Sequence, residues 1–178
     1  MKIKPQNIKE RVLQLKELLN SCVLCPRECR VDRTNGVLGY CRAGIDIEIA
    51  HTGSHHGEEP PISGTKGSGT IFFKYCTLSC VYCQNWQISQ SSSQSSVVSS
   101  QWLAGKMLKL QEQGAHNINL VSPTQYLPQI VEAIGFALEQ GLKIPLVYNT
   151  SGYERAEIIA LLEGIIDIYL PDIKYAVE

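Results

Sequence analysis

Apolar residues in the second half of the chain occur in short continuous runs that are separated by longer amphipathic stretches. Four runs are apolar almost throughout and predict β-strands: 70–74, 117–122, 145–150 and 167–174. The stretches between them predict helices: 101–113, 127–140 and 153–163. Strand–helix–strand repeats at this spacing indicate parallel strands joined by right-handed crossovers. Strands without polar alternation also indicate a sheet covered on both faces.

The first half of the chain is less regular. Apolar residues recur at helical spacing over 6–19, which predicts a helix, and isoleucines alternate with polar residues over 45–49, which predicts a short strand. Residues 51–69 are rich in Gly and Pro and predict a loop. The low-complexity polar tract 89–100 predicts a surface loop without chemistry of its own.

These elements predict an α/β fold, specifically a partial (β/α) TIM-like barrel that stops after about four strands. A closed eight-stranded barrel needs about 250 residues, and the chain has 178. A last parallel strand left uncovered is a liability, so we expect a truncated form of a longer barrel. The expected organisation is an N-terminal helix with a cysteine-rich extension over 1–69, followed by the partial barrel over 70–178.

Composition narrows the class of partner. The chain is 44% apolar and 19% charged, with a net charge of −1, which predicts no general attraction to nucleic acid or to anionic membranes. Residues 1–43 carry nine Lys and Arg against four Asp and Glu, which we interpret as a solvated basic surface. No apolar run is long enough to span a bilayer and the start does not resemble a signal peptide, so we expect a cytoplasmic protein. Thiols stay reduced there, and seven cysteines cannot all pair, so cysteine clusters indicate metals or redox chemistry.

Three cysteines follow the run 70–74 at a spacing that suits one metal centre. Cys76, Cys80 and Cys83 form the pattern C-x3-C-x2-C. Thiolates are soft ligands that select zinc, copper(I) or iron–sulfur centres. Three ligands leave one position open in a tetrahedral zinc site, or one iron of a [4Fe–4S] cluster without protein ligation, and a reactive centre needs such an open position. In parallel βα barrels the chemistry gathers at the carboxyl ends of the strands, where these cysteines are expected.

The same residues resemble a known signature. Cys76-x3-Cys80-Val81-Tyr82-Cys83, with an aromatic residue before the last cysteine, resembles the motif of the radical S-adenosylmethionine (SAM) superfamily. The wider run from GEEPPISGTKGSGTIFF to CQNWQIS is similar to a branch of the pyruvate formate-lyase activating enzyme group. The resemblance covers nearly the whole chain from Cys22 onward, and it implies a partial barrel of the radical SAM type. A zinc knuckle or unrelated thiols are the alternative interpretation.

The resemblance implies a reaction and its cofactors. Cys76, Cys80 and Cys83 would hold a [4Fe–4S] cluster, and SAM would chelate its fourth iron. One electron from the reduced cluster would cleave SAM to methionine and a 5′-deoxyadenosyl radical, which would abstract hydrogen from a substrate. By analogy with glycyl-radical activating enzymes, that substrate would be a glycine residue of a partner protein. An electron donor such as flavodoxin or ferredoxin is implied as a second partner.

The resemblance also implies SAM-binding residues at three further strand ends. Ser122 and Thr124 follow the second strand, where the superfamily often has a Gly-rich segment that contacts the SAM amino group. Around Asn149 and Ser151 the chain resembles the Asp-Thr-Asn-Gly stretch of activating enzymes, with Asn149 in place of the acid. Three more residues are implied at the SAM site: Tyr82 packs against its adenine or shields the cluster, Lys174 meets its carboxylate, and Asp172 orients Lys174 or SAM. Core packing of Tyr82 and an ordinary Asp172–Lys174 ion pair are the alternatives.

The four remaining cysteines form a second group, with the spacing C-x2-C-x3-C-x11-C: Cys22, Cys25, Cys29 and Cys41. Four thiolates are a closed ligand set, which suits zinc or a second, fully ligated [4Fe–4S] cluster. Four arginines among them would offset the negative charge: Arg27, Arg30, Arg33 and Arg42. Scattered buried thiols are the alternative.

Two other functions remain open at this point. The chain could be a zinc-binding interaction module with two sites and no catalysis. It could also be an inactive radical SAM fragment that keeps the cluster loop but lacks part of the SAM and substrate pocket.

Overall fold

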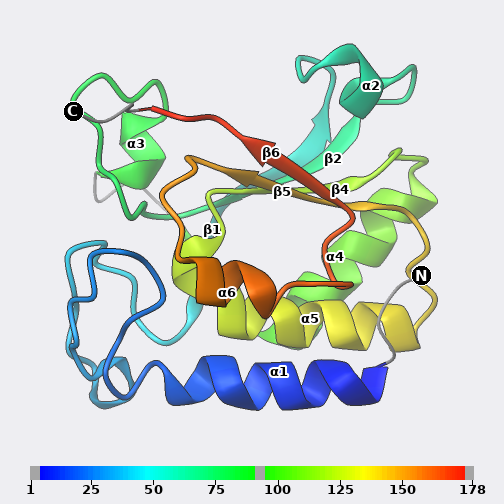
Figure 1. Ribbon diagram of the computed structural model, residues 1–178. Coiled ribbons are helices and arrows are strands. Elements are labelled where there is room, and N and C mark those ends of the chain that lie inside the picture. Colours follow the sequence, from blue (N-terminus) through cyan, green and yellow to red (C-terminus); the bar gives the residue numbers. More distant parts are fainter. Residues whose placement is uncertain (1–4, 91–94, 175–178) are drawn as a thin grey trace.

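A mixed β-sheet forms the centre of the protein (Figure 1). The computed structural model describes residues 5–90 and 95–174, and over these residues the sheet has six strands. In spatial order they are β3 (Ser96–Val98), β1 (Ile47–His55), β2 (Ser68–Phe73), β4 (Ile118–Val121), β5 (Leu146–Thr150) and β6 (Ile168–Pro171). β2, β4, β5 and β6 are parallel, whereas β1 is antiparallel to both of its neighbours.

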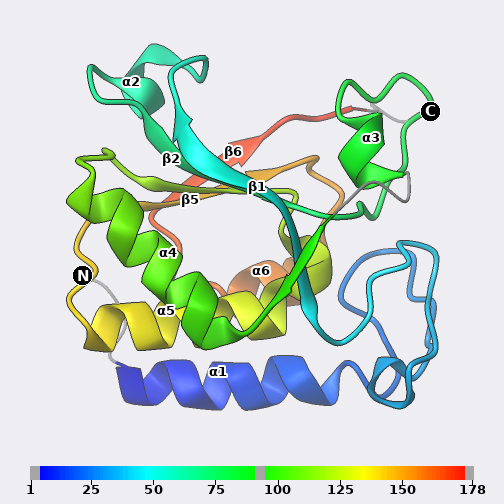
Figure 2. The same cartoon turned by 180° about the vertical axis from the view of Figure 1, so that it is seen from behind.

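The helices form two layers beneath one face of this sheet. α4 (Ser100–Glu112), α5 (Leu127–Glu139) and α6 (Ala156–Ala160) lie directly under the strands, and α1 (Pro5–Glu17) packs against α5 on the side away from the sheet (Figures 1 and 2). Four short helices complete the described part: α2 (Pro60–Ser63), α3 (Trp86–Ser89), and the 3-10 turns η1 (Arg33–Asn35) and η2 (Thr124–Tyr126). Within the described ranges, no helix is both long and apolar enough to cross a membrane.

The period of each element explains which side is buried. Alternate strand residues such as Ile71 and Leu120 enter the core with the apolar sides of α4 and α5, including Leu103 and Ile130. Residues of α1, such as Leu15, belong to the same core cluster. The hydrophobic core therefore draws on residues from both 1–69 and 70–178 and ties the N-terminal helix to the sheet layer.

The expected partial barrel is wrong, because the sheet is open and mixed. β1 pairs along β2 in antiparallel register, with Thr52 opposite Ile71 and Gly53 opposite Thr70. This pair and β3 occupy the edge of β2 that would face another parallel strand in a barrel. The stretch His51–His55 is polar and Gly-containing, so backbone hydrogen bonds hold it in the sheet, and its side-chain pattern gives no strand signal.

Two expected loops contain regular structure, while the parallel strand series is confirmed by its pairing. The stretch 51–69 holds the end of β1, the helix α2 and the start of β2. The polar tract 89–100 includes β3, and its residues 91–94 lie outside the described part. The helix expected over 153–163 is shorter, because α6 spans Ala156–Ala160.

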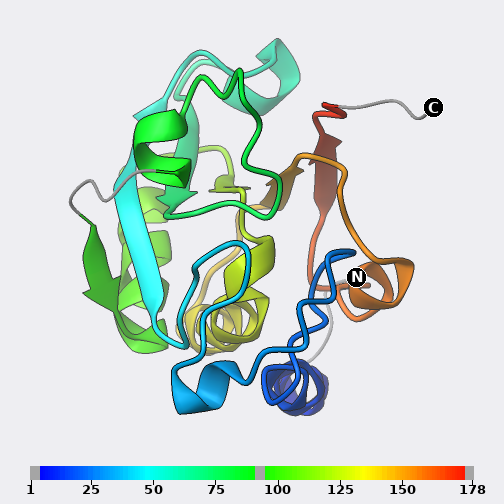
Figure 3. The same ribbon diagram turned by 90° about the vertical axis from the view of Figure 1, so that its left-hand side faces the viewer.

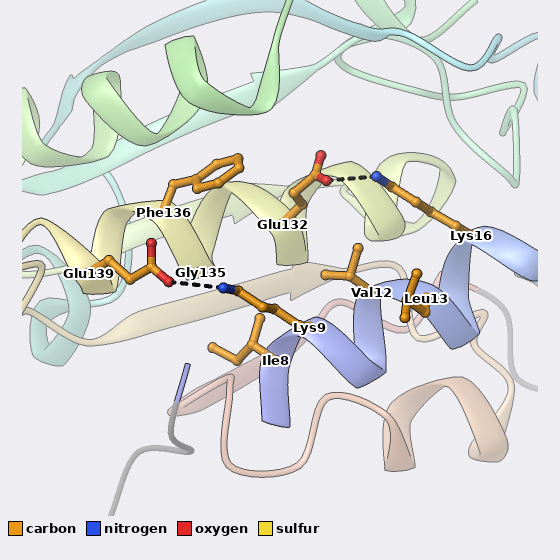
Figure 4. A pocket seen from close by; sticks show the side chains of 9 residues that line it. All are labelled: Ile8, Lys9, Val12, Leu13, Lys16, Glu132, Gly135, Phe136 and Glu139. Carbon is orange, nitrogen blue, oxygen red and sulfur yellow. Dashed lines mark hydrogen bonds and ion pairs between the residues drawn. The ribbon is translucent and has the colours of Figure 1, made fainter. Parts of the chain in front are cut away.

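A small apolar hollow lies between α1 and α5, away from every residue that the sequence marks for chemistry (Figure 4). Its volume is about 290 Å³. Two ion pairs bridge it from helix to helix, Lys16 to Glu132 at 2.6 Å and Lys9 to Glu139 at 3.8 Å. These groups are exposed, so each pair contributes little to stability.

Candidate functional site

The three-cysteine loop, residues 74–90, leaves the carboxyl end of β2. Its base is closed by a backbone hydrogen bond of 3.0 Å from Tyr75 N–H to Ile88 O, just before the loop rejoins the body of the protein. Gln125 adds a second closure, since its side-chain amide donates to the carbonyl oxygens of Lys74 and Tyr75 and also to that of Ser122. A single buried amide therefore joins the ends of β2 and β4.

Local hydrogen bonds set the positions of the three thiols. Cys76 Sγ accepts from the Leu78 backbone N–H at 3.4 Å, and Cys83 Sγ lies 3.3 Å from the Ser89 hydroxyl at the end of α3. Cys80 is buried. The Gln90 side chain donates to its carbonyl oxygen at 2.7 Å.

The backbone is strained at both cysteine groups. Six residues other than glycine have a positive φ angle in the described part of the chain. Five of them lie in these two regions, Glu28, Arg30, Arg42, Tyr75 and Ser79, and the sixth, Ser122, follows β4. Such conformations cost about 1–3 kcal/mol each and are found mostly where surrounding contacts or function hold them. The concentration of strain separates these loops from the rest of the fold.

A cavity of about 740 Å³ opens beside the three-cysteine loop. Its walls include the cross-strand row formed by Phe72, Val121 and Asn149, which are paired in register across β2, β4 and β5. Nine of the residues implied for the cluster and SAM line it: Cys76, Cys80, Tyr82, Cys83, Ser122, Asn149, Ser151, Asp172 and Lys174. The parallel strands bring these residues together because their carboxyl ends meet at one edge of the sheet.

Thr124 is the one implied SAM residue that lies outside this cavity. It is buried below the strand ends, where its hydroxyl donates to Glu154 Oε1 at 2.7 Å and lies 3.2 Å from the Tyr148 hydroxyl. Ser122 has a left-handed backbone, with φ of 52°. The chain turns there, so Ser122 lines the cavity and Thr124 is directed into the core.

Glu154 was not identified from the sequence. Oε1 of its buried carboxyl group also accepts from the Thr150 hydroxyl, so the threonine after β4 and the last residue of β5 are tied to one acid. Within the described residues, Oε2 is buried and has no hydrogen-bond partner. Burial raises the pKa of Glu154, although its hydrogen bonds with Thr150, Thr124 and Tyr148 act to lower it. No sequence motif or spacing identifies Glu154, an acidic residue four positions after the end of β5, as part of a site.

Two further residues missed by the sequence interpretation line the cavity, His55 and Glu58. Both come from the stretch 51–69, which was expected to be a loop. His55 is the last residue of β1, which pairs with β2, and Glu58 follows shortly after it. Glu58 Oε1 accepts from the Asn119 side-chain amide at 3.0 Å, so β4 holds this carboxylate in place. Only the antiparallel pairing of β1, which is not local in the sequence, brings them to the site.

The end of β6 closes the cavity opposite the cysteines. The Tyr82 hydroxyl donates to the carbonyl oxygen of Lys174 at 2.8 Å, so the three-cysteine loop and the last described residues lie side by side (Figures 1 and 3). The Lys174 ammonium donates to Asp172. This hydrogen bond is the main cause that raises the pKa of Lys174, so the ammonium stays charged at neutral pH. The cavity therefore has one fixed cation at its rim.

The second cysteine group lies beneath the three-cysteine loop, in the segment between α1 and β1 (Figure 3). Burial raises the pKa of Cys25 to about 11 and also raises that of Cys41, and for both the neighbouring thiols of the group add to the rise. The thiols are therefore close enough to disfavour one another's ionisation. Arg33 is buried among them and donates to Cys22 Sγ at 3.9 Å, a long and weak contact.

Whether the two cysteine groups can bind metals depends on the chemistry of their thiols and on local packing. Four neighbouring thiols whose ionisation is disfavoured would be stabilised as thiolates by a cation between them. Gly39 passes so close to Cys29 that a Cβ atom there would lie 3.2 Å from its Sγ. In their present positions, however, no three His, Cys, Asp or Glu side chains of the described residues form a group that could hold a metal ion. Binding would therefore require the sulfur atoms to move together.

Comparison with known proteins gives one relative. The chain is 30% identical over 183 aligned positions to an uncharacterized protein of the archaeon Methanocaldococcus jannaschii, with 97% of this chain and 51% of that protein covered. The chain thus spans about half the length of the curated relative it matches. No family model matches the chain. No solved structure matches it.

Proposed function

We propose that the protein is a radical SAM iron–sulfur enzyme and that the cavity beside the three-cysteine loop is its reaction site. One observation carries the proposal. Residues from the ends of four parallel strands, which the sequence links to the cluster and to SAM, line a single cavity of about 740 Å³. A volume of several hundred Å³ is typical of sites for cofactor-sized ligands.

In this proposal the protein supplies binding and orientation, and the cofactors supply the chemistry. Cys76, Cys80 and Cys83 would ligate three irons of a [4Fe–4S] cluster. When bound, the cluster with SAM at its open iron supplies one electron that breaks the sulfonium C–S bond, giving methionine and a 5′-deoxyadenosyl radical able to take hydrogen from a substrate.

The remaining cavity residues divide between charge and hydrogen bonding. Lys174, held by Asp172, provides the positive charge for the SAM carboxylate, to which it can make a charge-assisted hydrogen bond. Asn149, Ser122 and Ser151 provide neutral hydrogen-bonding groups for the amino and carboxylate ends. Tyr82 ties the cluster loop to the end of β6 through the Lys174 carbonyl.

The wider biology is proposed on the same basis. We expect a cytoplasmic setting, a one-electron donor such as flavodoxin or ferredoxin, and a partner protein whose glycine Cα–H gives up hydrogen. The described part of the chain contains no helix that would cross a membrane.

The direct test is reductive cleavage of SAM. After anaerobic reconstitution with iron and sulfide, and reduction with dithionite, the protein should release 5′-deoxyadenosine. Cys80→Ala should abolish release, because the cluster loses a ligand. Val81→Ala is the matched control: this side chain is 97% exposed beside Cys80, so release should persist.

Each other outcome points to a different function. A colourless protein that binds two zinc ions would support an interaction module without catalysis. A brown protein that holds a cluster but releases no 5′-deoxyadenosine would support an inert radical SAM fragment. Release that survives Cys80→Ala would overturn the three-cysteine assignment.

A further inference from the structure

Arg27 joins the two cysteine groups directly. It lies midway between Cys25 and Cys29, yet its guanidinium leaves that segment and donates from Nε to Thr77 O at 2.6 Å and from Nη2 to Leu78 O at 3.3 Å. Thr77 and Leu78 are the residues that follow Cys76 in the three-cysteine loop. Arg27 was expected to offset thiolate charge among the cysteines of its own segment. Its guanidinium instead contacts the backbone of the three-cysteine loop.

Tyr40 supports the same contact from the other end of the segment. The Arg27 guanidinium carbon lies 3.4 Å from the centre of the Tyr40 ring, a close cation–π arrangement. The Tyr40 hydroxyl donates to Leu78 O at 3.4 Å, so both side chains share one carbonyl acceptor. Arg27 and Tyr40 are thus a two-residue clamp on the backbone of the three-cysteine loop.

The clamp also connects sulfur to sulfur through consecutive hydrogen bonds. Tyr40 backbone N–H donates to Cys29 Sγ at 3.5 Å, and Leu78 backbone N–H donates to Cys76 Sγ at 3.4 Å. The Tyr40 hydroxyl bond to Leu78 joins these two contacts. Any movement of Cys29 and Cys25 toward a shared metal must therefore move Arg27 and Tyr40, and with them the turn after Cys76.

We propose that a soft metal bound by Cys22, Cys25, Cys29 and Cys41 acts as a brace that fixes the three-cysteine loop through Arg27 and Tyr40. The second cysteine group is then a positioning device for the first. Its importance for SAM chemistry rests on the function proposed above, but the mechanical coupling does not. Thr77 is 4% exposed, so without Arg27 its carbonyl oxygen would lose its charged partner in a site closed to water.

The test measures how a metal at the second cysteine group affects the three-cysteine loop when that loop cannot bind a cluster. In a variant with Cys76, Cys80 and Cys83 all changed to Ser, zinc can act on the loop only from the second group. This full-length variant should bind one zinc ion, and hydrogen exchange of the amides in 77–82 should slow by about tenfold on zinc binding, equivalent to about 1.4 kcal/mol. Exchange in β4, read from the same spectra, reports whether the fold is intact.

Arg27→Gln combined with Tyr40→Phe, in the same background, should still bind zinc but should remove the slowing in 77–82. Arg30→Gln is the matched control, because its exposed guanidinium pairs with Glu28 at 3.4 Å and, in the described part of the chain, makes no contact with the three-cysteine loop. It should keep the full response. Failure to bind zinc, exchange that zinc does not alter, or slowing that survives the loss of Arg27 and Tyr40 would each overturn the brace. None of these outcomes bears on SAM cleavage, which this background cannot support.

Discussion

At the scale of single residues, the site depends on which way each strand end turns. Ser122 and Asn149 line the cavity, whereas Thr124 and Thr150 are buried on the other side of the same turns. Glu154 holds both threonines through one carboxylate oxygen. Glu154 is therefore a positioning residue for the two loops. The effect of burial on its carboxyl group can be tested through the pH dependence of the free energy of unfolding.

Glu154→Gln should change how stability depends on pH. The folded protein raises the pKa of Glu154 above its ordinary value of 4.5, so the folded state binds the proton more tightly. The contribution of this group is fully present below pH 4.5 and is lost as pH rises through the raised pKa. Urea unfolding over this range should show the original chain losing stability relative to Glu154→Gln as pH rises.

The assignment would be contradicted if the free energy of unfolding of the original chain, relative to that of Glu154→Gln, stayed constant or increased as pH rises. Glu154→Ala should cost roughly 1–3 kcal/mol below pH 4.5, because two buried threonine hydroxyls lose their acceptor, and the cost should fall as pH rises. Glu157→Gln, on the exposed side of the same segment, controls for the loss of one negative charge.

The sequence was informative about residues where a motif or a strand end marks them. Nine of the implied residues share a cavity because parallel strands converge at their carboxyl ends, and that rule needs only the order of the strands. Thr124 and Glu154 lie beyond this rule. The direction of Thr124 follows from the left-handed turn at Ser122, and a serine gives no sequence signal for a positive φ angle. Glu154 is placed by its hydrogen bonds with Thr124 and Thr150.

At the scale of elements, the junction between β2 and β4 places the three-cysteine loop. Gly69 lies where β2 meets β4, and a Cβ atom there would be 2.9 Å from Asn117 O and 3.1 Å from the Cβ atoms of Ala115 and Leu110. Two of these groups belong to the turn before β4, so there is little freedom to move aside. The β2–β4 pairing therefore requires glycine at this position.

Gly69→Ala should destabilise the protein by roughly 1–3 kcal/mol, because the added methyl group overpacks this junction. Gly105→Ala in α4 is the control, since nothing lies within 4 Å of its Cβ position. Alanine there should stabilise the helix by up to about 1 kcal/mol. Denaturant unfolding compares the two, and equal effects would refute the packing argument.

Element prediction succeeded where side chains carry the pattern. The strands β4, β5 and β6 and the helices α4 and α5 lie within or overlap the stretches marked by their apolar period. It failed for the second half of β1 and for β3, where Thr, Gly, Ser and His pair through the backbone. Such pairing depends on a partner strand that is distant in the chain, so a local window cannot reveal it.

At the scale of the whole molecule, one core joins the N-terminal helix to the sheet layer. α1 covers α5, and Leu15 is fully buried in the common cluster. The barrel interpretation identified the four parallel strands and the helices between them, but it missed α3 and β3 and could not show that β1 and β3 form one edge of an open sheet. The N-terminal part is therefore integral to the described fold.

Leu15→Ala should cost roughly 2–5 kcal/mol and should lower protection against hydrogen exchange in β4 as well as in α1. A loss of protection confined to α1 would show that the helix is a separate unit. Leu13→Ala is the matched control, because that side chain is 63% exposed, whereas Leu15 is 0% exposed. Its effect should stay within about 0.5 kcal/mol.

The central claim is that three cysteines hold an iron–sulfur cluster and leave one iron free for SAM. The most direct measurement is hyperfine spectroscopy of the reduced, reconstituted protein with SAM labelled with ¹⁷O in its carboxylate. We expect coupling between the label and the cluster spin, and this coupling should disappear when Cys76, Cys80 and Cys83 are changed to Ser. Absence of coupling in the unaltered chain, or coupling that persists without these cysteines, would contradict it.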